Sequence, residues 1–158
     1  MKPTFATLSK NYSSNRSISQ DTLFKEIGWD DLIGNSAYAN TCAIRVSLAL
    51  IKSGINVRGR IVIKKGPHKG KLIEPGQAKL SQLLAGILFL GAPEKFKSTD
   101  ADKGIGHRRG VVSFWRVPGY LHDSGGHIDL VSPALGGIRI CGSSCFWNSQ
   151  EVWFWELL

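Results

Sequence analysis

Residues 41–53 read TCAIRVSLALIKS, and this stretch decides the fold. Apolar side chains recur along it at helical spacing on two adjoining stripes, which predicts a central and largely buried helix. Asn40 or Thr41 is suited to cap the N-terminus of this helix, and Gly54 follows its last residue as a stop signal. Cys42 is therefore expected in the first turn of a buried helix.

The chain around this helix divides into a helical first half and a strand-rich last third. Hydrophobic periodicity predicts helices near residues 5–8, at 20–28 and at 77–89, a strand at 60–64, and loops at 29–39, 65–71 and 95–109. Aromatic, β-branched or alternating patterns predict strands at 111–117, 127–131, 138–140 and 152–157. Helices followed by an antiparallel sheet define the α+β class. We expect residues 1–158 to form a single domain, because a chain of this length has room for one substantial core.

The composition excludes several classes of protein. Hydrophobic residues make up 42% of the chain and charged residues 20%, which is incompatible with wholesale disorder. The longest apolar run, 83–91, is far shorter than the roughly 18 to 20 residues needed to cross a bilayer, so membrane insertion is not expected. The first residues lack the apolar stretch of a signal peptide, so we expect no general secretory signal. A net charge of +8 indicates attraction to a polyanion or an acidic protein.

The cysteines fall into two groups. Cys42 stands alone, whereas residues 141–145 read CGSSC and place Cys141 and Cys145 around residues that favour a turn. This pair could close a small disulfide loop or form half of a zinc site. No Cys-x2-Cys, His-x3-His or His-Glu-x-x-His pattern accompanies it, so neither a metal nor another cofactor is expected. A disulfide would favour an oxidising compartment, which fits export by a route that reads no N-terminal peptide.

Cys42 and His127 have the chemistry of a nucleophile and its base. The positive end of a helix dipole favours a thiolate in the first turn, although a lone buried Cys is often inert. His127 and Asp129 lie two residues apart on a predicted strand, so both side chains are expected on one face. A Cys at a helix start followed by a His on a later strand is the chain order of papain-like thiol hydrolases. We therefore expect Cys42 to act as nucleophile, with its own N–H as an oxyanion donor, and His127 as general base.

Asp129 is the expected orienting residue for His127. No other carboxylate occurs between Leu130 and Glu151, so Ser132 or a backbone carbonyl are the alternatives.

Three other functions remain open on the residues alone. Residues 58–71 are basic and could bind nucleic acid or an acidic glycan in a non-catalytic module. No base-stacking aromatic residue lies among these charges, so the segment is better explained as a solvated loop. No nucleic-acid partner is therefore expected. The aromatic residues 153–155 could form a carbohydrate platform, although aromatic strand residues usually pack in or around a core. A transglutaminase would use the same Cys–His pair as a hydrolase and differ only in its products.

Several motifs in order resemble the family 4 amidase effectors of type VI secretion systems. The segments are 40–47 (NTCAIRVS), 75–77 (PGQ), 109–114 (RGVVSF), 125–130 (GGHIDL), Cys141-x3-Cys145 and 151–155 (EVWFW). The resemblance implies a papain-like cysteine amidase that is made in the cytoplasm and delivered into the periplasm of a rival Gram-negative cell. It implies hydrolysis of the γ-D-glutamyl–meso-diaminopimelate bond in the stem peptide of peptidoglycan. A periplasmic target is compatible with a Cys141–Cys145 disulfide.

The resemblance also implies a periplasmic immunity protein that protects kin cells. The basic surface of the chain favours an acidic partner. We expect the loop 118–126, which leads directly into His127, to overhang the active site and contact this partner. Tyr120, Leu121 and His122 supply the aromatic and apolar anchors that binding hot spots favour.

Overall fold

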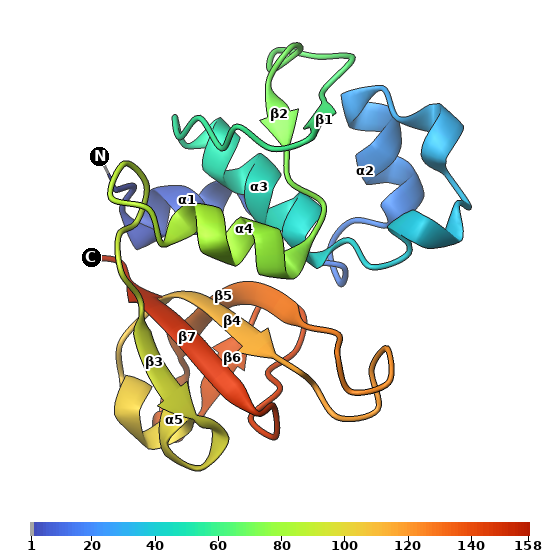
Figure 1. Ribbon diagram of the computed structural model, residues 1–158. Helices are drawn as coiled ribbons and strands as arrows, with labels where there is room; N and C mark the ends of the chain where they lie inside the picture. Colours follow the sequence, from blue (N-terminus) through green and yellow to red (C-terminus); the bar gives the residue numbers. More distant parts are fainter. Residues whose placement is uncertain (1) are drawn as a thin grey trace.

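A layer of helices packs against one face of an antiparallel sheet in this computed structural model, which describes residues 2–158 (Figure 1). The helical layer contains α1 (Phe5–Asn11), α2 (Gln20–Ile27), α3 (Cys42–Lys52) and α4 (Gln77–Leu84), together with the short 3-10 turns η1 (Asp30–Leu32) and η2 (Ser36–Tyr38). No helix of the described residues is long and apolar enough to cross a bilayer. The predicted α+β class is confirmed, but helices and strands are not fully separated along the chain, because two strands precede α4 and one helix follows the first strand of the main sheet.

The main sheet has five antiparallel strands in the order β3-β7-β4-β5-β6. These are β3 (Glu94–Lys97), β4 (Gly110–Trp115), β5 (His127–Pro133), β6 (Arg139–Cys141) and β7 (Glu151–Glu156), with the 3-10 turn η3 (Leu135–Gly137) before β6. A separate hairpin of β1 (Ile61–Val62) and β2 (Leu72–Ile73) extends from the helical layer, and its turn carries the predicted basic loop 65–71 (Figure 1).

Helix α3 is the centre of the molecule, as predicted. All ten residues from Cys42 to Ile51 are buried, and the helix packs against β5, α1 and α4. Its apolar side chains form one core with the inward-facing residues Val111, Ile128 and Leu130 of the sheet. Because side chains alternate along a strand, neighbouring residues of the same strands form a second core on the opposite face.

The predicted loop 95–109 is wrong. This segment contains β3, which pairs with β7, and α5 (Ser98–Ile105), which covers the second core. The segment is mostly polar, so its sequence lacks a strong apolar period. Pairing with β7 and burial of Ala101 and Ile105 against the sheet supply the stabilisation that the local sequence does not show.

The predicted helix 77–89 ends earlier, at Leu84. Gly86 follows and its N–H bonds to the carbonyl of Leu83, which tightens the chain into turns. Ile87 and Leu88 were expected on the apolar face of the helix, but they are 94% and 78% exposed.

Polar and apolar residues alternate along 127–131, which is typical of a half-buried strand, but β5 is buried on both faces from Ile128 to Val131. This happens because β5 lies inside the sheet, with α3 on one side and the second core on the other. A polar residue on this strand is therefore removed from solvent on either face.

Candidate active site

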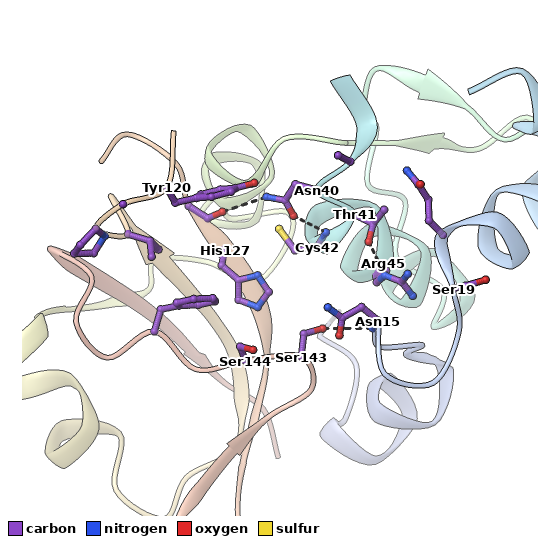
Figure 2. A pocket seen from close by; sticks show the side chains of 17 residues that line it. Asn15, Ser19, Asn40, Thr41, Cys42, Arg45, Tyr120, His127, Ser143 and Ser144 are labelled. Atoms are coloured by element: carbon purple, nitrogen blue, oxygen red, sulfur yellow. Dashed lines mark hydrogen bonds between the residues drawn. The ribbon is translucent and has the colours of Figure 1, made fainter. Parts of the chain in front are cut away.

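An open cleft of about 590 Å³ lies where the N-terminus of α3 meets the start of β5. The loop 117–120 forms one wall, and the turn that follows β6 contributes Ser143, Ser144 and Phe146 (Figure 2). The N-terminal region contributes Asn15, Ser19 and Gln20. Both layers of the molecule therefore build this cleft.

Cys42 and His127 meet in the cleft. Cys42 lies in the first turn of α3 and is 6% exposed, and His127 is the first residue of β5 (Figure 2). Burial lowers the pKa of His127, but hydrogen bonds with Asp129 and Cys42 and the charges of these two groups outweigh burial and raise that pKa to about 9. The imidazole is therefore held as an imidazolium beside Cys42 at neutral pH.

Asp129 is fully buried and accepts a hydrogen bond from His127. Oδ2 lies 2.8 Å from His127 Nε2, which leaves the other ring nitrogen for Cys42. The same oxygen accepts the backbone N–H groups of Ser143, at 2.7 Å, and Ser144, at 3.2 Å. Burial raises the pKa of Asp129, but these donors and the charge of His127 lower it overall, so the carboxylate stays ionised. The predicted pairing of His127 with Asp129 on one face is present.

Tyr12 belongs to this network and was not found from the sequence. Its hydroxyl donates to Asp129 Oδ1 at 2.7 Å, and the backbone N–H of Leu130 donates to the same oxygen. Burial and the neighbouring Asp129 charge raise the pKa of Tyr12 far above its usual value, so the hydroxyl keeps its proton and acts as a donor. Tyr12 lies in a polar loop after α1, where no sequence pattern distinguishes it from a surface tyrosine.

Asn40 connects the nucleophile helix to the His127 strand. Its Oδ1 accepts the backbone N–H of Cys42 at 3.1 Å, so Asn40 does the capping even though Thr41 occupies the N-cap position. Asn40 Nδ2 points to the carbonyl of Gly126 at 3.5 Å (Figure 2). The N–H of Cys42 was expected to be an oxyanion donor, and in this structure it is engaged by Asn40 instead.

Cys141 and Cys145 form a disulfide. The bridged loop contains Ser143 and Ser144, whose N–H groups hold Asp129. The half zinc site considered from the spacing is therefore a disulfide, and among residues 2–158 no cluster of three or more His, Cys, Asp or Glu is arranged to hold a metal ion.

The loop 118–126 stands at the rim of the cleft. Tyr120 lines the cleft, and its ring lies so close to Gly125 that a Cβ there would clash at 2.1 Å. Leu121 and His122 are exposed to solvent. A Cβ on Gly126 would clash with Gln77 at 2.0 Å, so the two glycines allow close packing before His127.

The basic segment 58–71 does not contribute to the cleft. Most of its cationic side chains are exposed on the hairpin, and Arg60 pairs with the buried carboxylate of Glu74 through two hydrogen bonds. This arrangement fits a solvated loop that the Arg60–Glu74 ion pair holds to the rest of the fold.

A family model described as type VI secretion system amidase effector protein 4 matches residues 38–155. The chain belongs to this family. The match includes Cys42, His127 and Asp129, whereas Tyr12 lies outside the matched residues. As a family 4 amidase effector the chain is an amidase, and the alternative of a non-catalytic basic module finds no support. No curated protein sequence matches the chain significantly.

Solved structures show the same fold. The effector Tae4 from Enterobacter cloacae in complex with its immunity protein Tai4 shares 20% identity over 100% of both chains, with a TM-score of 0.78. The same effector alone shares 22% identity over 100% of this chain and 98% of that chain, with a TM-score of 0.78. The effector Tae4 from Salmonella typhimurium, bound to the Enterobacter cloacae immunity protein, shares 18% identity over 99% of both chains, with a TM-score of 0.73. The predicted papain-like α+β fold of this amidase effector is confirmed.

Proposed function

We propose that this amidase effector is a cysteine endopeptidase that hydrolyses the γ-D-glutamyl–meso-diaminopimelate bond of peptidoglycan stem peptides. The observation that carries the proposal is the buried chain of Cys42, His127 and Asp129 at an open cleft in a chain of this family. We assign Cys42 as nucleophile, His127 as general acid and base, and Asp129 as the residue that orients His127.

The first half of the reaction forms an acyl-enzyme. The Cys42 thiolate attacks the γ-carbonyl carbon of D-glutamate, and the carbonyl oxygen takes up the negative charge of the tetrahedral intermediate. The His127 imidazolium then gives its proton to the amine nitrogen of diaminopimelate as the C–N bond breaks. The products of this step are the free amine and a γ-glutamyl thioester on Cys42.

The second half regenerates the enzyme. Neutral His127 takes a proton from water, and the hydroxide attacks the thioester carbonyl. The C–S bond breaks, Cys42 leaves as a thiolate, and His127 is again an imidazolium. Asp129 stays ionised throughout. It stabilises the imidazolium of the resting enzyme and the imidazolium that forms again when His127 takes a proton from water.

The tetrahedral oxyanion needs hydrogen-bond donors near Cys42. Asn40 Nδ2 makes one long bond to a carbonyl and lies at the N-terminus of α3 beside the nucleophile. We assign Asn40 to this stabilisation, in addition to its capping of α3.

Replacement of the nucleophile tests the proposal. Cys42→Ala and His127→Ala are each expected to lower the rate of stem-peptide cleavage by on the order of 10³-fold or more, because the two side chains act as a unit. The measurement is mass spectrometry of sacculi digested by each variant, which also identifies the bond that is cut. Unfolding curves of the variants serve as the control for folding. Full lytic activity of Cys42→Ala would contradict the assignment.

The same digests separate a hydrolase from a transglutaminase. Addition of a primary amine would give amide-exchanged stem peptides with a transglutaminase, whereas a hydrolase gives a free γ-carboxylate on D-glutamate. The proposal requires the free carboxylate as the main product.

We also propose that the effector acts in the periplasm of a target Gram-negative cell and is neutralised there by an immunity protein. Family membership supports the delivery route, and the relatives solved with an immunity protein support the partner. The net charge of +8 favours an acidic partner. Residues 1–158 would act as one amidase domain, because both layers supply side chains to the cleft.

A further inference from the structure

Arg45 is a buried cation in the wall of the cleft. It lies one turn after Cys42 on α3, its exposed fraction is 2%, and it lines the same cavity as Cys42 and His127 (Figure 2). Burial lowers the pKa of Arg45, yet a guanidinium remains charged under all ordinary conditions. A desolvated charge of this kind is normally compensated by an anion.

Only some of the N–H groups of this guanidinium have a hydrogen-bond acceptor in the protein, and those acceptors are neutral. Arg45 Nε donates to Thr41 Oγ1 at 2.7 Å, and Nη1 donates to the carbonyls of Ser13 and Ser14 at 3.1 and 3.0 Å. Within residues 2–158, Nη2 donates to no protein acceptor, and no carboxylate pairs with Arg45. Both N–H groups of Nη2 are thus left for a group that enters the cleft.

The buried carboxylate of Asp129 does not pair with Arg45, because other donors already occupy it. Asp129 accepts hydrogen bonds from His127, Tyr12 and three backbone N–H groups. Among the described residues that line the cleft none is acidic, so Arg45 and the His127 imidazolium give the cleft a positive character.

The guanidinium of Arg45 lies at the N-terminal end of α3. Its bond to Thr41 places the head group beside the residue that precedes Cys42, at the start of α3 (Figure 2). Asn15, Ser143 and Ser144 add polar groups to the cleft, whereas Val117, Pro118 and Phe146 supply apolar surface. A ligand with one carboxylate close to its scissile carbonyl matches this arrangement.

We propose that Arg45 binds the α-carboxylate of the D-glutamate residue whose γ-carbonyl is attacked by Cys42, and that it selects this residue over its α-amide. The inference rests on the proposed function, since it concerns the substrate of that reaction. The α-carboxylate lies only a few bonds from the γ-carbonyl, whereas the free carboxylate of diaminopimelate lies at the far end of a long side chain. A charged hydrogen bond from a desolvated guanidinium discriminates strongly against a neutral amide.

Two stem peptides test the proposal, identical except that one carries the D-glutamate α-carboxylate and the other its α-carboxamide. Wild-type protein is expected to cleave the carboxylate peptide with a kcat/KM on the order of 10- to 100-fold higher. Arg45→Met should lose this preference, and Arg45→Lys should keep a part of it because the charge remains without the planar fork. Arg58→Met, at an exposed arginine outside the cleft, removes the same charge and should keep the full preference.

The ratio of the two substrates is measured on one enzyme sample, so incomplete folding of a variant cancels. Equal cleavage of both peptides by wild type, or an unchanged preference in Arg45→Met, would overturn the inference. A preference that responds to amidation of diaminopimelate instead of D-glutamate would also overturn it.

Binding separates this inference from the proposed function. Calorimetry of Cys42→Ala with the carboxylate peptide should show tighter binding than with the carboxamide peptide, and Cys42→Ala/Arg45→Met should bind both equally. Selective binding without cleavage by wild type would support the role of Arg45 and reject the proposed reaction. Equal binding of both peptides by Cys42→Ala would reject the role of Arg45.

Discussion

At the scale of single residues, the neighbours of His127 explain why its imidazole is charged at neutral pH. His127 is mostly buried, which alone would favour the neutral ring. Asp129 and Cys42 reverse this, and the pKa of His127 rises to about 9. Asp129 can do so because five donors hold its own carboxylate ionised in a fully buried position. The polar network around Asp129 thus keeps His127 protonated at neutral pH, as the proposed reaction requires.

The pH dependence of kcat/KM follows from this network. Activity is expected to fall as pH rises through about 9, because His127 then loses the proton it must donate. Asp129→Asn removes the charge that stabilises the imidazolium, so the falling limb should move to lower pH. Rates of stem-peptide cleavage between pH 6 and 10 measure the position of this limb in wild type and in Asp129→Asn. Asp30→Asn, at an exposed carboxylate, is the matched control, and an identical profile for Asp129→Asn and wild type would contradict the role of Asp129.

The same shift links His127 to stability. The folded pKa lies above the unfolded value of about 6.5, so the stabilisation from the charged ring is complete below about pH 6.5. It is lost as pH rises through about 9. The depressed pKa of Asp129 acts in the opposite direction, and its contribution is lost in acid.

At the scale of elements, the site is built where four segments meet. Helix α3 supplies Cys42 and β5 supplies His127 and Asp129. The loop after α1 supplies Tyr12, and the turn after β6 supplies the N–H groups of Ser143 and Ser144. The Cys141–Cys145 disulfide closes this turn, so it constrains two of the donors that hold Asp129.

Removal of this disulfide is expected to affect both stability and activity. The double variant Cys141→Ser/Cys145→Ser should be less stable by about 2 kcal/mol, the value for a short bridged loop. Its cleavage rate should also fall, because a looser turn holds Asp129 less firmly. Denaturant unfolding and cleavage assays measure the two effects. As a control, a reductant should lower the stability of wild type and leave that of the double variant unchanged. Equal stability of wild type and the double variant without reductant would show that the disulfide contributes nothing.

At the scale of the whole molecule, the charge and the cleft act together. The chain carries a net charge of +8, and one of its cations, Arg45, is buried in the wall of the cleft. A long-range positive field speeds association with acidic polymers and acidic proteins, and this effect is screened by salt. Residues 121–124 of the rim loop 118–126 are exposed beside the cleft.

The rim loop should separate inhibitor binding from catalysis. Leu121 is 64% exposed, so Leu121→Ala is expected to weaken binding of the cognate immunity protein by more than about 1 kcal/mol and to leave stem-peptide cleavage intact. Tyr120→Ala should reduce both, because Tyr120 also lines the cleft. His122→Ala tests the third predicted contact. The association rate should fall as salt is added; unchanged affinity with lost cleavage would assign the loop to the substrate alone.

The sequence was sufficient where the determinants are local. The 3.6-residue period of 41–53 predicted α3, and it placed Cys42 in the first turn. The alternation of β5 placed His127 and Asp129 on one face, since that relation depends only on a spacing of two. The turn-forming residues between Cys141 and Cys145 allowed the disulfide that is present. The linked motifs led to the family and to its fold.

The tertiary structure decided what depends on contacts between distant residues. Tyr12 reaches Asp129 across 117 positions of the chain, and no local pattern records such a contact. The polar segment 94–105 forms β3 and α5 because β7 and the second core stabilise it, which overrides its weak local signal. The sequence does not distinguish Arg45 from any other charged residue on a helix. Only the packing of the layers buries it in the wall of the cleft, without an acidic partner among the described residues. The sequence by itself thus determined the fold, the position of Cys42 in the first turn of α3 and the shared face of His127 and Asp129 on β5. Packing decided which polar groups surround these residues, because burial and long-range hydrogen bonds exist only once the layers are assembled.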